Sequence, residues 1–215
     1  MKISILVDDP RSWILPWASL LHEELERLGH EACLVASQDE IPQGDIAFFL
    51  GCSRIVEESN LAKNRLNLVV HPSDLPRGRG FSPLAWQILE GCSDIPICLF
   101  EAVPDVDAGD VYLRSVIALD GTELNEEIKY KQGKKTLEMC LRFLDSYPQI
   151  KASPQTGTPT YYKRRSARDS EIDVDMSLRA LFPLLRVVDN NRYPAYFFIN
   201  GAKYVLHIEK DDQST

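Results

Sequence analysis

The sequence predicts an α/β protein with a doubly wound, mostly parallel, Rossmann-like sheet and a C-terminal extension made of a helix and a β-hairpin. Three observations support this fold class. Short apolar runs alternate with helical patterns in the first half of the chain, as in parallel strands joined by helices. Two longer apolar runs and a long helical pattern follow. Near the end, two apolar runs flank Asn200-Gly201, a strong hairpin-turn signal.

The first half of the chain predicts four buried strands, "ISILVDD", "EACLVAS", "DIAFFLG" and "LNLVVH". Between the first two, "WASLLHEELERLGH" predicts an amphipathic helix in which Leu20, Leu21, Leu25 and Leu28 share one face and Gly29 ends the helix. A polar helical stretch separates the last two runs. This alternation should place helices on both faces of the sheet.

The second half predicts paired strands, "IPICLFEAV" and "VYLRSVIAL", on either side of the acidic loop "PDVDAGD". The segment "ELNEEIKYKQGKKTLEMCLRFLDSY" predicts a long helix that is interrupted near Gly133. These patterns divide the chain into a core domain at residues 1–150, a linker at 151–160 rich in Pro, Ser, Thr and Gly, and an extension at 161–215. We expect the final "DDQST" to be frayed.

Composition and charge disfavour several classes of protein. The 215 residues are 44% hydrophobic and 26% charged, which is ordinary for a globular protein. A net charge of −8 disfavours nucleic acid and anionic membrane surfaces as partners. No apolar run approaches the roughly 20 residues of a membrane span and no signal peptide is evident, so we expect a cytoplasmic protein. The five cysteines form no C-x-x-C pair, so neither disulfides nor a metal site is expected.

The strongest candidate for a functional site is His71-Pro72, where the fourth apolar run stops. Sheets of this class bind ligands at the carboxyl ends of their strands, so His71 and Gly51 should lie at the site. Asp107, in the acidic loop, could orient one imidazole nitrogen and leave the other free for acid–base or electrophilic chemistry. Alternatively, the histidine could fix its own loop and Asp107 could belong to an ordinary turn. No G-x-G-x-x-G follows the first strand, which disfavours a dehydrogenase.

The segment "HPSDLPRGRGFSPLAWQILEG" resembles the signature of the folate-dependent formyltransferases, in which a strand ends in Asn-x-His-Pro-Ser and continues Leu-Pro-x-x-x-Gly. Asp107 in "VDAGD" stands where that family has its catalytic aspartate, and "DIAFFLGCSRIVEE" resembles the segment that lines the folate pocket. The element that begins "YYKRRSARDSEIDVD" resembles one in formyltransferases acting on methionyl-tRNA or nucleotide sugars. The resemblance covers residues 45–210, and the N-terminal part looks shorter than is usual in the family.

The resemblance implies the formyltransferase fold, N10-formyltetrahydrofolate as co-substrate, no metal, and a set of site residues. His71 would stabilise the oxyanion formed when an amine attacks the formyl carbon, while Asp107 would orient the imidazole and help to remove the amine proton. The implied folate-binding residues are Phe49, Leu50, Gly51, Ile55 and Asp105. The implied substrate-binding residues are Ser73, Arg77, Gly78, Arg79, Gly80, Tyr162, Arg164 and Arg165. The loop with Arg77 and Arg79 could equally be a solvated one.

One position departs from the family pattern. Val69 stands where the family has a catalytic Asn, two residues before the histidine, and valine has no hydrogen-bond donor. Asn67 faces the same side of the strand but lies about 6–7 Å further back. Loss of one oxyanion donor typically lowers turnover about 10²–10³-fold, unless a backbone N–H or a water replaces it.

Among the substrates of the family, a nucleotide-linked amino sugar of surface polysaccharide synthesis, such as a 4-amino-4,6-dideoxy hexose, suits this chain best. Methionyl-tRNA formyltransferases carry a further β-barrel domain, and an acidic protein suits tRNA poorly. Glycinamide ribonucleotide formyltransferases lack a similar C-terminal element. Two alternatives stay open: a catalytically impaired homologue that binds folate or a nucleotide, and a formyltetrahydrofolate hydrolase. The terminal hairpin, with its edge strand and apolar residues, could form a homodimer.

Overall fold

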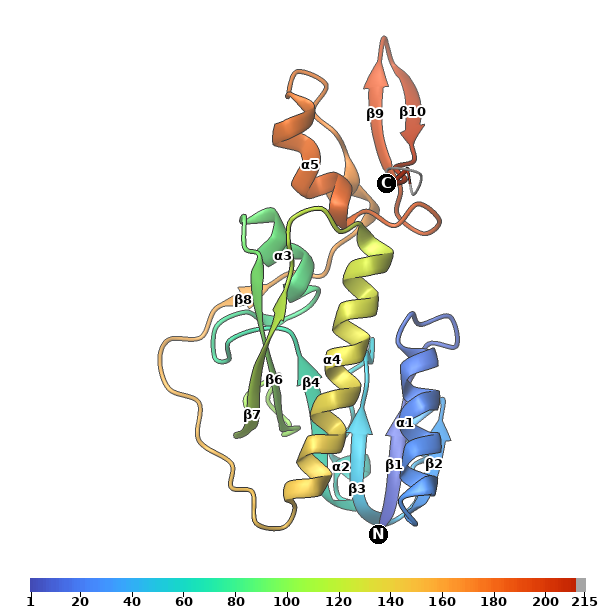
Figure 1. Ribbon diagram of the computed structural model, residues 1–215, viewed down its shortest axis with the longest axis vertical. Helices are drawn as coiled ribbons and strands as arrows, with labels where there is room; N and C mark the ends of the chain where they lie inside the picture. Colours follow the sequence, from blue (N-terminus) through green and yellow to red (C-terminus); the bar gives the residue numbers. More distant parts are fainter. Residues whose placement is uncertain (212–215) are drawn as a thin grey trace.

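The computed structural model describes residues 1–211 and is built around a six-stranded sheet (Figure 1). The strand order is β2-β1-β3-β4-β6-β7; β1 to β4 pair in parallel, whereas β6 and β7 pair antiparallel. The strands are β1 (Lys2–Leu6), β2 (Glu31–Val35), β3 (Gly44–Phe49), β4 (Asn64–His71), β6 (Asp94–Glu101) and β7 (Val111–Ala118). The predicted α/β class and mostly parallel sheet are therefore confirmed. All but the first residue of the predicted frayed tail lies outside the described residues.

Helices cover the two faces of the sheet unequally. They are α1 (Leu15–Arg27), α2 (Glu58–Leu61), α3 (Pro83–Leu89), α4 (Asn125–Ser146) and α5 (Leu178–Val187), with 3₁₀ turns η1 (Gln38–Glu40) and η2 (Ala167–Ser170). Buried side chains of α1, α3 and α4 form the main core with one face of the sheet, and Figure 1 shows α1 and α4 side by side there. The opposite face carries a smaller cluster that includes Ile41 and Leu61. The polar helical stretch predicted before β4 forms only α2, which is a single helical turn.

Two details of the predicted helices are wrong. In α1, Leu20 and Leu28 are 44% and 46% exposed, whereas Ala18 is buried with Leu21 and Leu25. Position 20 lies off the stripe that positions i, i+3 and i+7 make on a helix. Leu28 lies on that stripe but follows Arg27, the last residue of α1, and caps the helix end. The second detail is the interruption near Gly133, because α4 is continuous there.

Gly133 marks a close helix–helix contact and not a break. A Cβ at this position would lie 2.1 Å from Nε1 of Trp17 on α1, which is far inside van der Waals contact. Only glycine therefore lets the indole ring pack against the α4 backbone. The glycine weakens the local helix propensity, but the packed core compensates for it.

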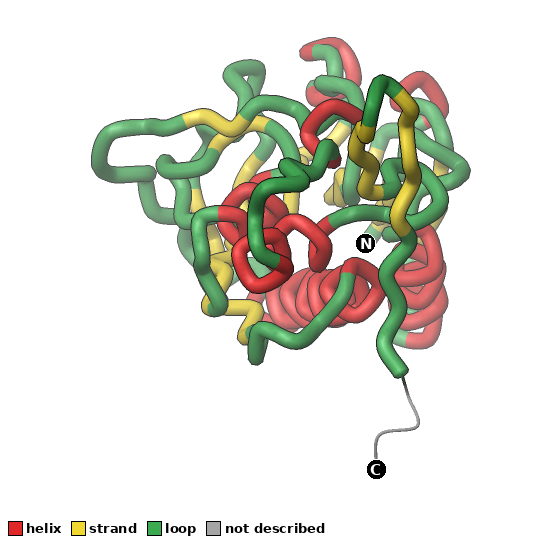
Figure 2. Tube along the Cα trace, turned by 90° about the horizontal axis from the view of Figure 1, so that it is seen from above, coloured by secondary structure: helices red, strands yellow, loops and turns green. Residues whose placement is uncertain are grey.

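The C-terminal extension contains α5 and a hairpin of β9 (Ala195–Ile199) and β10 (Ala202–Leu206), which projects beyond the end of the sheet (Figure 1). Asn200 and Gly201 have φ of 50° and 80°, as a two-residue type I′ turn requires, so the predicted hairpin is confirmed. Residues 151–160 run along the β7 side of the molecule in both views (Figures 1 and 2). They lead into β8 (Tyr161–Tyr162), which pairs in parallel with β5 (Arg79–Gly80).

A buried ion pair ties the extension to the core. Arg186 of α5 donates from Nε to the carbonyl oxygen of Glu123 at 3.0 Å and from Nη2 to its carboxylate at 3.1 Å, and both side chains are buried. Burial raises the pKa of Glu123, but hydrogen bonds from Lys131 and from backbone amides outweigh it and hold this pKa at about 2. The carboxylate is therefore charged, and α5 is fixed against the turn that precedes α4.

Among residues 1–211, no helix combines the length and the apolar character needed to cross a bilayer. The same residues contain no group of three or more His, Cys, Asp or Glu side chains arranged to hold a metal ion.

Candidate active site

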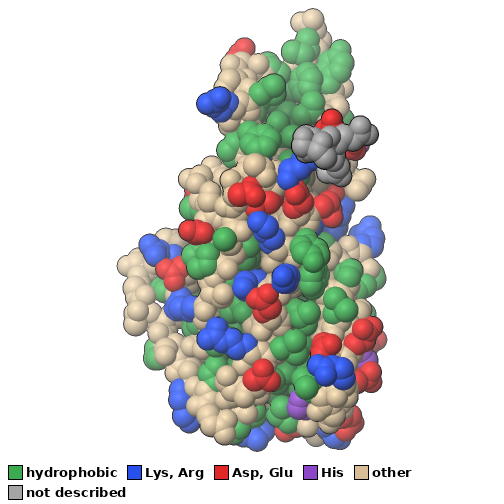
Figure 3. Space-filling model, viewed as in Figure 1, with side chains coloured by type: hydrophobic (Ala, Val, Ile, Leu, Met, Phe, Trp, Pro, Cys, Tyr) green, Lys and Arg blue, Asp and Glu red, His purple; other side chains and the backbone are tan. Residues whose placement is uncertain are grey.

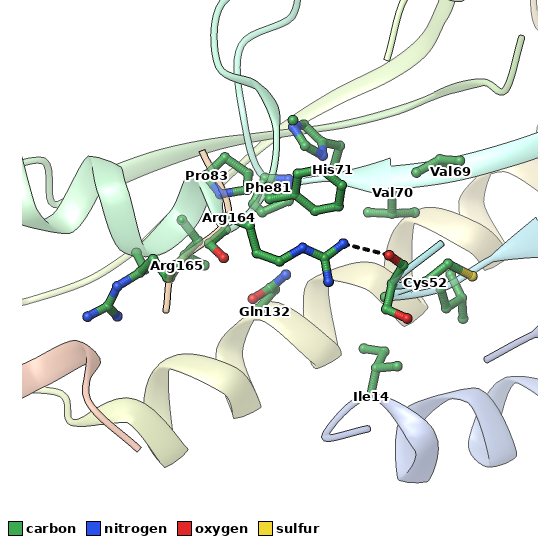
Figure 4. A pocket seen from close by; sticks show the side chains of 18 of the residues that line it. Ile14, Cys52, Val69, Val70, His71, Phe81, Pro83, Gln132, Arg164 and Arg165 are labelled. Atoms are coloured by element: carbon green, nitrogen blue, oxygen red, sulfur yellow. Dashed lines mark hydrogen bonds between the residues drawn. The ribbon is translucent and has the colours of Figure 1, made fainter. Parts of the chain in front are cut away.

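A cavity of about 500 Å³ lies at the carboxyl ends of β3 and β4 (Figure 4). Its volume is within the usual range of about 300–1,000 Å³ for small-molecule sites. The walls come from the ends of these strands, the loop after β6, the first turn of α3, the first half of α4 and the extension. The cavity therefore joins segments from the core and from residues 161–211.

His71 and Asp107 meet at this cavity. His71 is the last residue of β4 and is only 7% exposed. Its Nε2 lies 2.9 Å from the carbonyl oxygen of Gly78 and 3.7 Å from Oδ2 of Asp107. Because a carbonyl oxygen can only accept, Nε2 carries a hydrogen in this arrangement. The longer distance exceeds a hydrogen bond, but the carboxylate is near enough to stabilise a charged imidazole.

The backbone around Asp107 fixes its carboxylate. Asp107 has φ of +52°, in the left-handed region that costs a non-glycine residue about 1–2 kcal/mol. The amide N–H of Gly80 donates to Oδ2 at 2.7 Å. Gly80 itself has φ of +96°, and a Cβ there would lie 2.5 Å from the carbonyl oxygen of Tyr162. Only glycine therefore brings this amide close enough to hold the carboxylate.

The residue two positions before His71 has no side-chain hydrogen-bond donor. Val69 is half-buried and lines the cavity two residues before His71 (Figure 4). Asn67 is buried, does not line the cavity, and donates from Nδ2 to the carbonyl oxygen of Leu61 at 2.8 Å. Neither side chain therefore supplies the hydrogen bond that a family Asn would give.

One end of the cavity is mainly apolar. Phe49, Leu50, Gly51 and Ile55 line it from the end of β3 and the following loop, opposite Val106. The Cys52 thiol also lies there, and burial raises its pKa to about 12, so the thiol is protonated and unreactive. This end suits a flat, largely apolar ring system.

Two arginines of the extension also line the cavity. Arg164 donates from Nη2 to the carbonyl oxygen of Ser53 at 2.6 Å, and its guanidinium lies 4.1 Å from the centre of the Phe81 ring (Figure 4). Arg165 donates to the carbonyl oxygens of Val187 and Asp169, and burial lowers its pKa. Within residues 1–211, neither arginine forms an ion pair with a carboxylate. These two guanidinium groups therefore meet no carboxylate directly among the described residues.

Comparison with known proteins adds sequence and structural relatives. No protein-family model matches the chain. It is 27% identical over 138 residues to the methionyl-tRNA formyltransferase of Francisella philomiragia, which covers 64% of this chain and 44% of the relative. It is 26% identical over 168 residues to that of Rickettsia bellii, covering 78% and 55% respectively. The chain thus spans about half the length of the curated relatives it matches.

Solved structures of similar fold superpose on nearly all of the chain. A methionyl-tRNA formyltransferase from Clostridium thermocellum gives a TM-score of 0.84 at 22% identity and covers 100% of this chain and 95% of its own. The chain has the formyltransferase fold. A 4-N formyltransferase from Francisella tularensis gives 0.74 at 17% identity, with 98% of each chain covered. HypX from Aquifex aeolicus in complex with tetrahydrofolic acid gives 0.80 at 19% identity, covering 97% of this chain and 37% of its own. The resemblance seen in the sequence is confirmed.

On this formyltransferase fold, the residues predicted for the site fall into two groups. The cavity is lined by His71, Asp107, Phe49, Leu50, Gly51, Ile55, Gly80, Arg164 and Arg165. The remaining predicted residues do not line it: Asp105, Ser73, Arg77, Gly78, Arg79 and Tyr162.

The second group supports the walls of the cavity from outside. Arg77 forms an ion pair with Asp74 at 2.7 Å, and Tyr162 donates its hydroxyl to Glu90 at 2.6 Å. Ser73 is buried, while the Gly78 carbonyl accepts the bond from His71. The side chain of Arg79 likewise bonds to Gln155 and does not line the cavity, although Gly80, the next residue of β5, does.

Sequence reasoning missed a polar wall formed by α4 and the extension. Asn125, Lys129 and Gln132 lie on one side of α4 at spacings of four and three residues, and all three line the cavity. Lys129 forms an ion pair at 2.8 Å with Asp189, which lines the cavity together with Arg192 and Tyr193. The helical spacing was a usable signal, but the chain gave no indication that this face would be turned toward the site.

Proposed function

We propose that this protein transfers a formyl group from N10-formyltetrahydrofolate to the amino group of a small molecule. The observation that carries the proposal is the approach of His71 Nε2 to Asp107 Oδ2 at 3.7 Å, at a cavity with an apolar end. The apolar end would take the flat pterin ring, since Phe49, Leu50 and Ile55 offer apolar contacts to its faces. The resemblance of the sequence to formyltransferases supports the same chemistry.

In this reaction the amine nitrogen forms a bond to the formyl carbon, the bond from that carbon to N10 breaks, and the amine proton passes to the departing nitrogen. Negative charge develops on the formyl oxygen during the attack. A protonated His71 has two donors, so one nitrogen can hold Gly78 and Asp107 while the other donates to this oxygen. Asp107 stabilises the imidazolium and assists removal of the amine proton.

For the acceptor we propose a nucleotide-linked amino sugar of surface polysaccharide synthesis, of the 4-amino-4,6-dideoxy type. Arg164 and Arg165 would meet the diphosphate, because their charges are not neutralised by carboxylates among the described residues. Tyr193 could stack on the base or the sugar. The net charge of −8 disfavours a tRNA as the acceptor, although the curated relatives are methionyl-tRNA formyltransferases.

A panel of nucleotide-linked 4-amino and 3-amino sugars, each incubated with N10-formyltetrahydrofolate, tests the proposal. Mass spectrometry should detect one added formyl group on one of them, and His71→Asn and Asp107→Asn should each abolish it. Full activity in either variant would contradict the mechanism.

Val69 favours one second candidate, a homologue that binds these ligands without turnover. Binding of tetrahydrofolate with no formyl transfer to any amine would support it. Release of formate without an amine would instead support a formyltetrahydrofolate hydrolase.

We also propose that the hairpin forms a homodimer. Phe198, Ile199, Tyr204 and Val205 are all exposed, and Figure 3 shows apolar side chains gathered over this end of the molecule. Lys203 is the one charged residue in the sequence 194–206, so two acidic copies could meet here without charge repulsion. Light scattering should give twice the chain mass for the wild type and the chain mass for Tyr204→Lys. A monomeric wild type would contradict this proposal.

A further inference from the structure

The position of the Asp107 carboxylate depends on a strained backbone conformation, which other residues must stabilise. Its left-handed φ is unfavourable for a residue with a Cβ, and the chain around it has little room. A Cβ on Gly109, two residues later, would lie 1.8 Å from the carbonyl oxygen of Glu101, so the loop is pressed against the end of β6. Carbonyl oxygens that are shielded from water in such a loop need hydrogen-bond partners from the protein.

The partner is a side chain from residues 151–160. Gln155 donates from Nε2 to the carbonyl oxygens of Asp107 and Gly109, both at 2.8 Å. Its Oε1 accepts a hydrogen bond from Nη2 of Arg79 at 2.6 Å. Both amide hydrogens and the amide oxygen are therefore engaged.

This amide joins the two segments that hold the carboxylate of Asp107. The N–H of Gly80 donates to Asp107 Oδ2, and Gln155 binds Arg79, the residue before Gly80. Gln155 also binds the backbone of Asp107 directly. The chain on either side of Gln155 is also docked. Ser153 and Val111 exchange two backbone hydrogen bonds at 2.9 Å, and Thr160 accepts at Oγ1 from the N–H of Gly78.

We infer that Gln155 is a positioning residue that holds Asp107 in the conformation in which its carboxylate faces His71. Gln155 does not line the cavity, so it acts through the aspartate and not on a substrate. Residues 151–160 then serve the active site and do more than connect two parts of the chain. The inference rests on the proposed function, since it assigns a role within the same catalytic pair.

The test compares Gln155→Ala and Gln155→Glu with the wild type in the formyl-transfer assay. Glutamate keeps the length and can still accept from Arg79, but it cannot donate to the two carbonyl oxygens. Both variants should lower kcat about 10- to 100-fold, as expected when a catalytic group is misplaced, and leave the KM of both substrates within about twofold. If glutamate restores the wild-type kcat, or if the loss is in KM, the inference is wrong.

Asn190→Ala is a matched control for stability. Asn190 also exchanges two hydrogen bonds with the backbone, those of Ile208, and it does not line the cavity. This variant should lose a similar amount of thermal stability but keep its kcat. Should Gln155→Ala fail to fold, Gln155→Glu decides, because it fills the same volume.

Asp107→Asn separates this inference from the proposed function. If Asp107→Asn is inactive and the Gln155 variants are fully active, the inference alone fails. If Asp107→Asn is itself fully active, both the proposed mechanism and this inference fail.

Discussion

Val69→Asn should accelerate formyl transfer, because it places an amide donor where the cavity now has an isopropyl group. Val69 and His71 are two residues apart on β4, so their side chains leave the same side of the strand with Cα atoms about 6–7 Å apart. One preorganised donor to an oxyanion is worth about 10²–10³ in turnover. Since the surrounding site is not built for the amide, we expect a gain of at least about tenfold in kcat.

The same change should cost some stability. Val69 pairs in register with Phe49 and Phe100 and is half-buried, so replacing it forfeits about half of the burial energy of a valine, or about 1 kcal/mol. Urea unfolding should detect this loss, and stopped time points at saturating substrates should give kcat.

Val69→Leu is the control, because leucine has the branched shape of asparagine without its donor. It should show no gain in kcat. If Val69→Asn turns over no faster than Val69→Leu, a donor at this position has no role here, and the reasoning from the family pattern is refuted.

Three further predictions concern packing, acid stability and the acceptor. Gly133→Ala should lower the free energy of unfolding by about 1–3 kcal/mol in urea titrations, because the new Cβ would overlap Trp17. This loss should exceed the gain of about 1 kcal/mol in helix propensity. A variant more stable than the wild type would contradict the packing of Gly133 against Trp17. The pKa of Glu123 is lowered from 4.5 to about 2, so its stabilising effect is present above pH 4.5 and should be lost as the pH falls toward 2. Glu123→Gln should flatten this part of the urea midpoint–pH profile, and an unchanged slope would exclude Glu123 as its source. Arg164→Ala should raise the KM for the nucleotide sugar about tenfold and leave the KM for the folate unchanged; equal changes in both would show that Arg164 does not serve the acceptor.

Local sequence signals predicted the sheet well, and they also picked out His71 and Asp107, whose side chains lie 3.7 Å apart at the cavity. The apolar runs correspond to β1 to β4 because short buried strands need little more than continuous hydrophobic side chains. His71 was identifiable because Pro72 ends the strand directly after it. The hairpin turn at Asn200-Gly201 was identifiable because such a turn needs positive φ at both residues, which Asn and Gly tolerate.

What failed depended on contacts between distant segments. A glycine within a helical pattern reads as a break until its neighbour Trp17, more than a hundred residues earlier in the chain, is known. Arg77 and Arg79 are close in sequence to His71, yet their side chains bond to Asp74 and Gln155 and do not line the cavity. The wall formed by Lys129 and Asp189 required the docking of α5, which no local pattern indicates.

The pocket is assembled from two stretches of polypeptide that meet through Glu123 and Arg186. The sheet supplies the surface proposed for the one-carbon donor, whereas residues 161–211 supply much of the surface proposed for the acceptor. A graft of this region from a relative could therefore exchange one specificity and leave the other intact. Such a chimera should bring a guanidinium to position 186, because without it Glu123 would keep its bonds to Lys131 and to backbone amides but would no longer hold the grafted segment to the core.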